Sequence, residues 1–124
     1  MRYLGIDYGK KRIGLAISDP EGRLAFPYGR VRDIASIVRI VEKEGIGKII
    51  IGVPTLWHGG QSVQMKTVER FAAALGHAVK LEIGFENEMF TSKIAERASP
   101  KDKADAAAAA IILQSYLDKA HGQR

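Results

Sequence analysis

The sequence has no cysteine among its 124 residues. This excludes disulfide bonds, zinc–thiolate sites, iron–sulfur clusters and cysteine nucleophiles. A long hydrophobic run is also missing, because the longest, from Ala106 to Leu113, is far short of the roughly 20 residues that span a bilayer. An acid, Asp7, stands where an export signal needs apolar residues. We therefore expect a cytoplasmic protein without a membrane segment, folded as a single domain over residues 1–124.

Acidic residues are fewer than basic ones, with 14 Asp and Glu against 19 Lys and Arg, for a net charge of +5. Residues 1–48 hold ten basic and six acidic side chains and so carry most of the excess. The basic residues that cluster in this region are Lys10, Lys11, Arg12, Arg23, Arg30 and Arg32. Such a region predicts a polyanionic partner, nucleic acid first, although a merely solvated basic surface is the alternative.

Hydropathy patterns predict the element order βββ-α-β-α-β-α. Alternation and turn signals predict strands over 2–8, 12–18 and 23–28, followed by a helix between the N-cap Asp33 and Gly45. An apolar run predicts a buried strand over 48–53, and helical spacing predicts a helix over 61–75 that ends at Gly76. A fifth strand is expected through 79–83, and a last helix from Ser99 to about Ala120. This order predicts an α/β fold whose mixed five-stranded sheet has three antiparallel strands, then two parallel ones, flanked by helices.

Three acids are candidates for a functional site. Asp7 ends the first strand, where a buried acid is costly unless it is paired, solvated or bound to a cation. Asp105 shares a helix face with apolar residues at +3, +4 and +7. Glu88 follows the fifth strand in a loop, as does Glu86, for which a solvated position is the default. If Asp7, Glu88 and Asp105 converge, they form a site for Mg²⁺ or Mn²⁺ of the kind that hydrolyses phosphodiesters.

The glycine pattern around Asp7 has two interpretations. The segment Gly5–Gly14 resembles the first phosphate loop of actin-like and sugar-kinase ATPases, but those enzymes need two such domains and this chain is too short. The longer run from Gly5 to Asp19 resembles the opening of the YqgF/RuvX family of pre-16S rRNA nucleases. Three further segments resemble this family in order: Gly52-Val53-Pro54 with Gly59, Asn87-Glu88-Met89-Phe90-Thr91-Ser92, and Asp105 through Leu117.

The resemblance implies a ribonuclease H-like fold and a metal-dependent nuclease that processes the 5′ end of pre-16S rRNA in ribosome biogenesis. It implies Asp7, Glu88 and Asp105 as catalytic ligands of Mg²⁺ or Mn²⁺. The nucleic-acid-binding residues that we expect beside them are Gly9, Lys10, Arg12, Pro54, Gly59 and Thr91. The expected partner is structured precursor rRNA, bound by a monomer or a weak homodimer.

Two departures from the family pattern keep alternatives open. Asn87 stands where the family usually has Asp, and Met89 where it usually has Arg. The first change removes a negative charge beside the expected metal site, and the second removes a phosphate or ion-pair contact. The alternatives are a Holliday-junction resolvase acting on DNA and a nucleic-acid-binding factor without catalytic activity.

Overall fold

A computed structural model describes residues 1–53, 63–87 and 104–122 of the chain. Its five strands are β1 (Arg2–Asp7), β2 (Ile13–Ser18), β3 (Ala25–Val31), β4 (Ile46–Val53) and β5 (Glu82–Asn87). Its helices are α1 (Ile34–Glu44), α2 (Val63–Val79) and α4 (Ala104–Ala120). None of these helices has the length and hydropathy that a transmembrane helix needs.

The strands form one sheet in the order β3-β2-β1-β4-β5. β2 pairs antiparallel with both β1 and β3, whereas β4 pairs parallel with both β1 and β5. The predicted mixed sheet is thus confirmed. Because β1, β4 and β5 run in the same direction, their carboxyl ends meet at one edge of the sheet.

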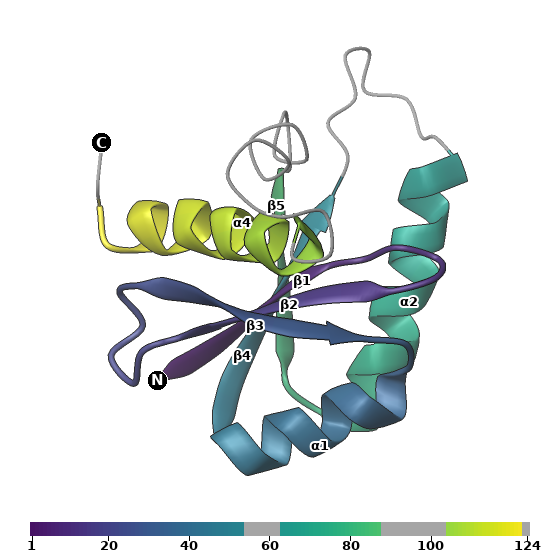
Figure 1. Cartoon of the computed structure of the whole chain (residues 1–124), viewed down its shortest axis with the longest axis horizontal. Coiled ribbons are helices and arrows are strands. Elements are labelled where there is room, and N and C mark those ends of the chain that lie inside the picture. The colour runs from purple at the N-terminus through teal and green to yellow at the C-terminus, as the bar shows by residue number, and fades with distance from the viewer. Residues whose placement is uncertain (54–62, 88–103, 123–124) are drawn as a thin grey trace.

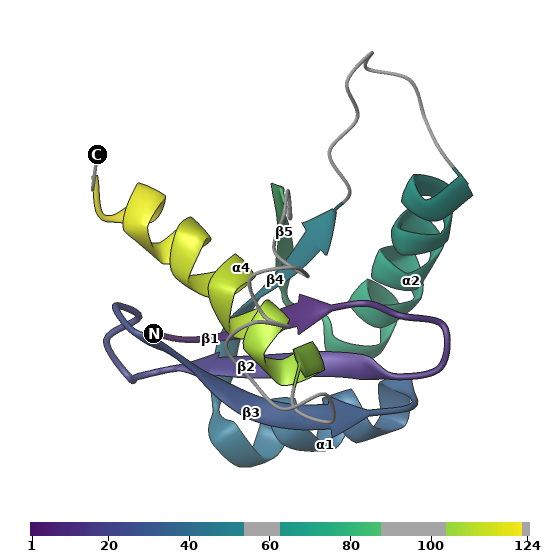
Figure 2. The same ribbon diagram turned by 45° about the horizontal axis from the view of Figure 1, so that its top comes forward.

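Helices cover both faces of this sheet (Figures 1 and 2). On one face, Leu4 and Ile6 of β1 join a core cluster with Ile37 of α1 and Leu75 of α2. On the other face lies α4, and the core cluster there comprises Ala16, Ile50, Ala109, Ile112, Leu113 and Leu117. The alternation along β1 therefore separates an α1/α2 face from an α4 face.

The boundaries of α1 follow the predicted capping residues. The Oδ1 atom of Asp33 accepts a hydrogen bond of 2.8 Å from the backbone N–H of Ser36. Gly45 ends the helix in the left-handed conformation, with φ 65° and ψ 44°. Both caps confirm the sequence prediction, because they depend on local chemistry alone.

The boundary between α2 and β5 differs from the prediction. The helix continues past Gly76 to Val79, and the strand begins only at Glu82. Lys80 adopts a left-handed backbone, with φ 56°, and donates its N–H to the carbonyl of Gly76. Val79 and Leu81 alternate in sequence as strand residues would, but they pack against the core from the helix end and the turn. These two residues are apolar because they pack against the core, and their spacing only resembles that of a strand.

Candidate metal and nucleic-acid site

Asp7 is the last residue of β1 and lies on the α4 face of the sheet. Two residues earlier, α4 crosses Gly5 so closely that a Cβ on this glycine would lie 2.7 Å from the Cβ of Leu113. Since side chains alternate along a strand, Asp7 points to the same face as Gly5. The register of the sheet pairs Asp7 directly with Gly14 of β2.

Gly14 is where α4 meets β2. A Cβ on Gly14 would overlap the carbonyl oxygen of Asp105 and lie 3.0 Å from the Cβ of Asp105. Directly opposed residues of antiparallel strands hold their Cβ atoms about 4.5–5.5 Å apart. The glycine therefore brings Asp105 onto the same face as Asp7, within side-chain reach of it. No group of three or more potential metal-ligating side chains occurs within the described residues.

The carboxylate of Asp105 is paired with arginines from two strands. Its Oδ2 atom lies 2.7 Å from Nε of Arg12 and 3.8 Å from Nη1 of Arg30. Oδ2 is itself buried, and no donor among the described residues meets hydrogen-bond geometry at it, so the Arg12 contact is an ion pair without an aligned hydrogen bond. Buried polar atoms without a hydrogen bond are rare in folded proteins, and this makes the oxygen a candidate ligand for a cation.

Asp105 lies near the start of the described part of the last helix. The sequence predicts that this helix opens at Ser99, which lies outside the described residues; α4 as described runs from Ala104 and has Asp105 in its first turn. The apolar stripe predicted beside it is confirmed, since Ala108, Ala109 and Ile112 are buried. An acid in the first turn also interacts favourably with the helix dipole.

The turn between β1 and β2 carries the predicted basic residues. A Cβ on Gly9 would lie 2.8 Å from the carbonyl oxygen of Arg12, so this tight turn requires glycine at that position. Lys10 is exposed, and the side chain of Arg12 is 54% exposed while it contacts Asp105. The turn thus places positive charge directly beside the carboxylate of Asp105.

Four of the predicted site residues, namely Pro54, Gly59, Glu88 and Thr91, lie outside the described residues. Asn87, which precedes Glu88, ends β5 opposite Val53 and is exposed. The carboxyl ends of β1 and β5 both reach the edge of the sheet where Asp7 lies. In the sequence, Glu88 directly follows Asn87.

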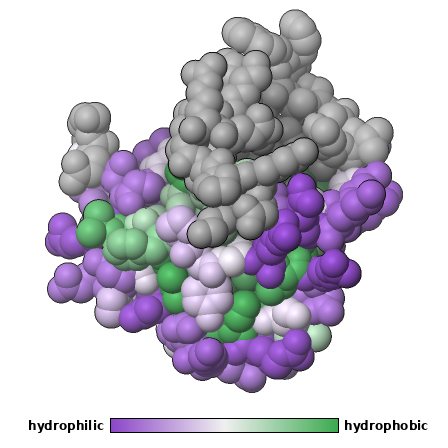
Figure 3. Space-filling model, in the orientation of Figure 1, coloured by the Kyte–Doolittle hydropathy of each residue, from purple (hydrophilic) through white to green (hydrophobic). Residues whose placement is uncertain are grey.

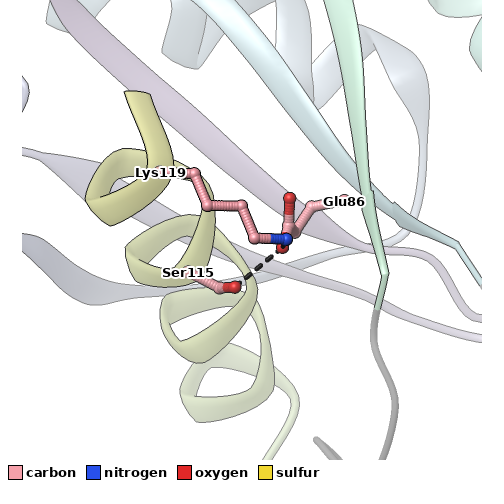
Figure 4. A network of polar contacts seen from close by, with 3 residues as sticks. All are labelled: Glu86, Ser115 and Lys119. Atoms are coloured by element: carbon pink, nitrogen blue, oxygen red, sulfur yellow. Dashed lines mark hydrogen bonds and ion pairs between the residues drawn. The ribbon is translucent and has the colours of Figure 1, made fainter. Parts of the chain in front are cut away.

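Glu86 corrects one sequence expectation, because it is buried rather than solvated. Its side chain is 7% exposed and lies on β5 under α4 (Figure 4). Its Oε2 atom accepts hydrogen bonds of 2.7 Å from the hydroxyl of Ser115 and from the ammonium group of Lys119. Alternation along β5 was the available signal, but the strand was predicted to end at residue 83. Two donors one helical turn apart therefore make Glu86 a structural anchor of α4.

The chain resembles known proteins over most of its length. Residues 1–119 match the family model described as "RuvX: Holliday junction resolvase". The chain belongs to the RuvX/YqgF family. Two curated relatives, from Chloroflexus aurantiacus and Maridesulfovibrio salexigens, share the name "Putative pre-16S rRNA nuclease". Each is 37% identical to the chain, over 93% and 97% of it and over 85% and 100% of the relative.

Solved structures support the RuvX/YqgF assignment at the level of the fold. The RuvC protein of Thermus thermophilus superposes with a TM-score of 0.63, covering 99% of this chain and 98% of its own. The same score is found for T. thermophilus RuvC in complex with a Holliday junction substrate. The identities are 13% and 14%, so this likeness shows the ribonuclease H-like fold alone. The predicted fold, family and nuclease class are confirmed.

Proposed function

We propose that this chain hydrolyses phosphodiester bonds of pre-16S rRNA, using Mg²⁺ or Mn²⁺ held by Asp7, Glu88 and Asp105. The names of its RuvX/YqgF relatives support the choice of pre-16S rRNA as the substrate. The observation that carries the proposal is that Gly14 pairs with Asp7 and packs against Asp105, at the edge where the parallel strands end.

The donor set fits a hard divalent cation. Carboxylate oxygens are the ligands that Mg²⁺ and Mn²⁺ prefer. Oδ2 of Asp105 is a buried carboxylate oxygen to which no described residue donates a hydrogen bond of good geometry. Glu88 follows β5 directly, and this position supports its role as the third ligand. When bound, the metal supplies an activated water and neutralises charge on the phosphate.

The chain's own residues would bind and orient the substrate. Arg12 lies beside Asp105 and is more than half exposed, so its guanidinium is available to a phosphate next to the carboxylates. Lys10 adds a second cation in the same turn, and Gly9 permits the turn to be this tight. Pro54, Gly59 and Thr91 would border the bound strand.

Cleavage of a transcript that carries the 5′ end of pre-16S rRNA tests the function. Wild type should cleave it only with Mg²⁺ or Mn²⁺, and Asp105→Asn should reduce the rate by orders of magnitude. Asp118→Asn is the matched control, because it makes the same substitution at an exposed position on the same helix. Cleavage that survives Asp105→Asn, or that falls equally in Asp118→Asn, contradicts the assignment.

Thermal melts separate this result from misfolding. The ion pair of Asp105 joins partly exposed groups, so removing it should cost at most about 1 kcal/mol without metal. Millimolar Mn²⁺ should raise the melting temperature of wild type through binding to the native state, and should raise that of Asp105→Asn less. Equal shifts would show that Asp105 does not hold the cation.

A second candidate is cleavage of four-way DNA junctions. The family description and the fold shared with RuvC favour it. Two symmetric cuts require a dimer, so we expect this activity only if the protein dimerises in solution. Binding of either substrate without cleavage in any divalent ion would instead support the third alternative, a binding factor in which Asn87 and Met89 have weakened the site.

A further inference from the structure

A basic pocket lies at the corner where β2 begins and β3 ends. It has a volume of about 490 Å³ and is lined by Lys11, Arg12, Arg30, Val31 and Arg32. The antiparallel register, in which Ile13 opposes Val31, brings these two strand ends together. Strongly hydrophilic side chains gather on this side of the molecule (Figure 3).

Within the described residues, the charge of this pocket is poorly compensated. Asp105 pairs with its lining there, through Arg12 and Arg30. Lys11 and Arg32 form no ion pair with any described residue and are exposed. Four cations around one concave surface repel one another, and an anion that enters relieves this repulsion.

The pocket also adjoins the candidate metal site. Arg12 both lines the pocket and lies 2.7 Å from Oδ2 of Asp105. Across the sheet, Asp7, Gly14 and Arg30 are register partners on successive strands, so the carboxylates and the pocket lie along one row. A polynucleotide strand with one phosphate at the carboxylates therefore has a neighbouring phosphate within reach of the pocket.

We propose that the pocket binds a backbone phosphate adjacent to the cleaved one, so that the substrate strand leaves the carboxylates across β2 and β3. This inference rests on the proposed function and adds the direction in which the strand is held. Arginine and lysine contact phosphate oxygens without reading the base. RNA and DNA offer the same phosphodiester chemistry, so the pocket should hold either strand.

Salt-dependent binding without divalent ions tests the pocket. Fluorescence anisotropy would measure the affinity of a short single-stranded RNA, and of DNA of the same sequence, over a series of salt concentrations in EDTA. The test variant is Lys11→Ala/Arg32→Ala, whose side chains line the pocket without pairing with Asp105. We compare the slope of the logarithm of the association constant against the logarithm of the salt concentration. For both strands, this slope should be flatter than that of wild type by about 0.7 for each phosphate that the variant no longer neutralises.

The matched control is Arg39→Ala/Lys43→Ala, which also removes two positive charges from exposed positions. Both residues lie on α1, which covers the opposite face of the sheet from α4 (Figure 2). We expect this control to keep the wild-type slope. The proposal that the pocket binds phosphate is overturned if the slope is unchanged in Lys11→Ala/Arg32→Ala, or if it is flattened equally in the control. A flattened slope with RNA alone would overturn the phosphate contact, because it would implicate the 2′-hydroxyl.

Two further measurements keep the result interpretable. Arg32→Glu reverses one charge at an exposed side chain and should flatten the slope even if the double variant is unstable. Wild type that binds through the pocket but cleaves nothing with Mn²⁺ would overturn the proposed function and leave the pocket standing. Wild type that cleaves, with Lys11→Ala/Arg32→Ala binding as wild type does, would overturn the pocket and leave the function standing.

Discussion

Gly14→Ala should displace the start of α4 and disturb the candidate site without changing any charge. The added Cβ would overlap the carbonyl oxygen of Asp105 and lie 2.5 Å from its carbonyl carbon, about 0.9 Å inside ordinary contact at 3.4 Å. The obstructing atoms belong to a helix backbone, so they cannot rotate away. The start of α4 must move from β2, and Asp105 moves with it.

The cost follows from this overlap. Forcing a methyl group into a packed contact costs about 1–3 kcal/mol. For a domain of this size, that should lower the melting temperature by roughly 3–12 °C. A displacement approaching 1 Å at a ligand should also weaken Mn²⁺ binding and slow cleavage by about 100-fold.

Gly29→Ala on β3 is the control, because a Cβ there meets no atom within 4 Å. Its free energy of unfolding should lie within about 1 kcal/mol of the wild-type value, and it should keep both Mn²⁺ binding and cleavage. Differential scanning fluorimetry, calorimetric Mn²⁺ titration and a cleavage time course measure the three effects. If Gly14→Ala melts and binds Mn²⁺ as Gly29→Ala does, the approach of α4 to β2 does not position Asp105.

Three further outcomes are expected. Arg12→Ala should bind Mn²⁺ more tightly by calorimetry, because it removes a positive charge 2.7 Å from Oδ2 of Asp105; equal affinities would contradict the site. Lys119→Met should destabilise the fold by about 1–2 kcal/mol in denaturant melts, because it leaves the buried carboxylate of Glu86 with one donor, and wild-type stability would refute the anchor. Hydrogen bonds from the hydroxyl and backbone N–H of the serine three residues later hold the pKa of Asp33 below its ordinary value of 3.8. A depressed pKa stabilises the folded protein fully above the unfolded-state pKa, and this stabilisation is lost as pH falls through the folded-state pKa. Asp33→Asn should therefore flatten the decline of the melting temperature below about pH 4. An unchanged decline would count against the cap.

Local chemistry made much of the fold predictable. The caps of α1, the turns between the first three strands and the apolar run of β4 each depend on residues near one another in sequence. Alternation alone also puts Asp7 and Gly5 on one face of β1, since they are two residues apart on a strand. The end of α2 was mispredicted because Val79 and Leu81 are apolar for tertiary reasons, and the same error hid the burial of Glu86 on β5.

The sequence by itself determined the order of elements and the acids worth testing. Periodicity gives the elements, and the cost of burying a carboxylate singles out Asp7 and Asp105. Glu88 is singled out by its loop position and by the family resemblance. Only the tertiary structure decided that Gly14 lies between Asp7 and Asp105, which are 98 positions apart in the chain, and that Arg12 and Arg30 pair with Asp105. The physical reason is that a close contact between a helix and a strand depends on the register of the sheet and on a glycine at the contact. Neither can be read from the sequence around Asp105, because the strands and the glycine lie far from it in the chain.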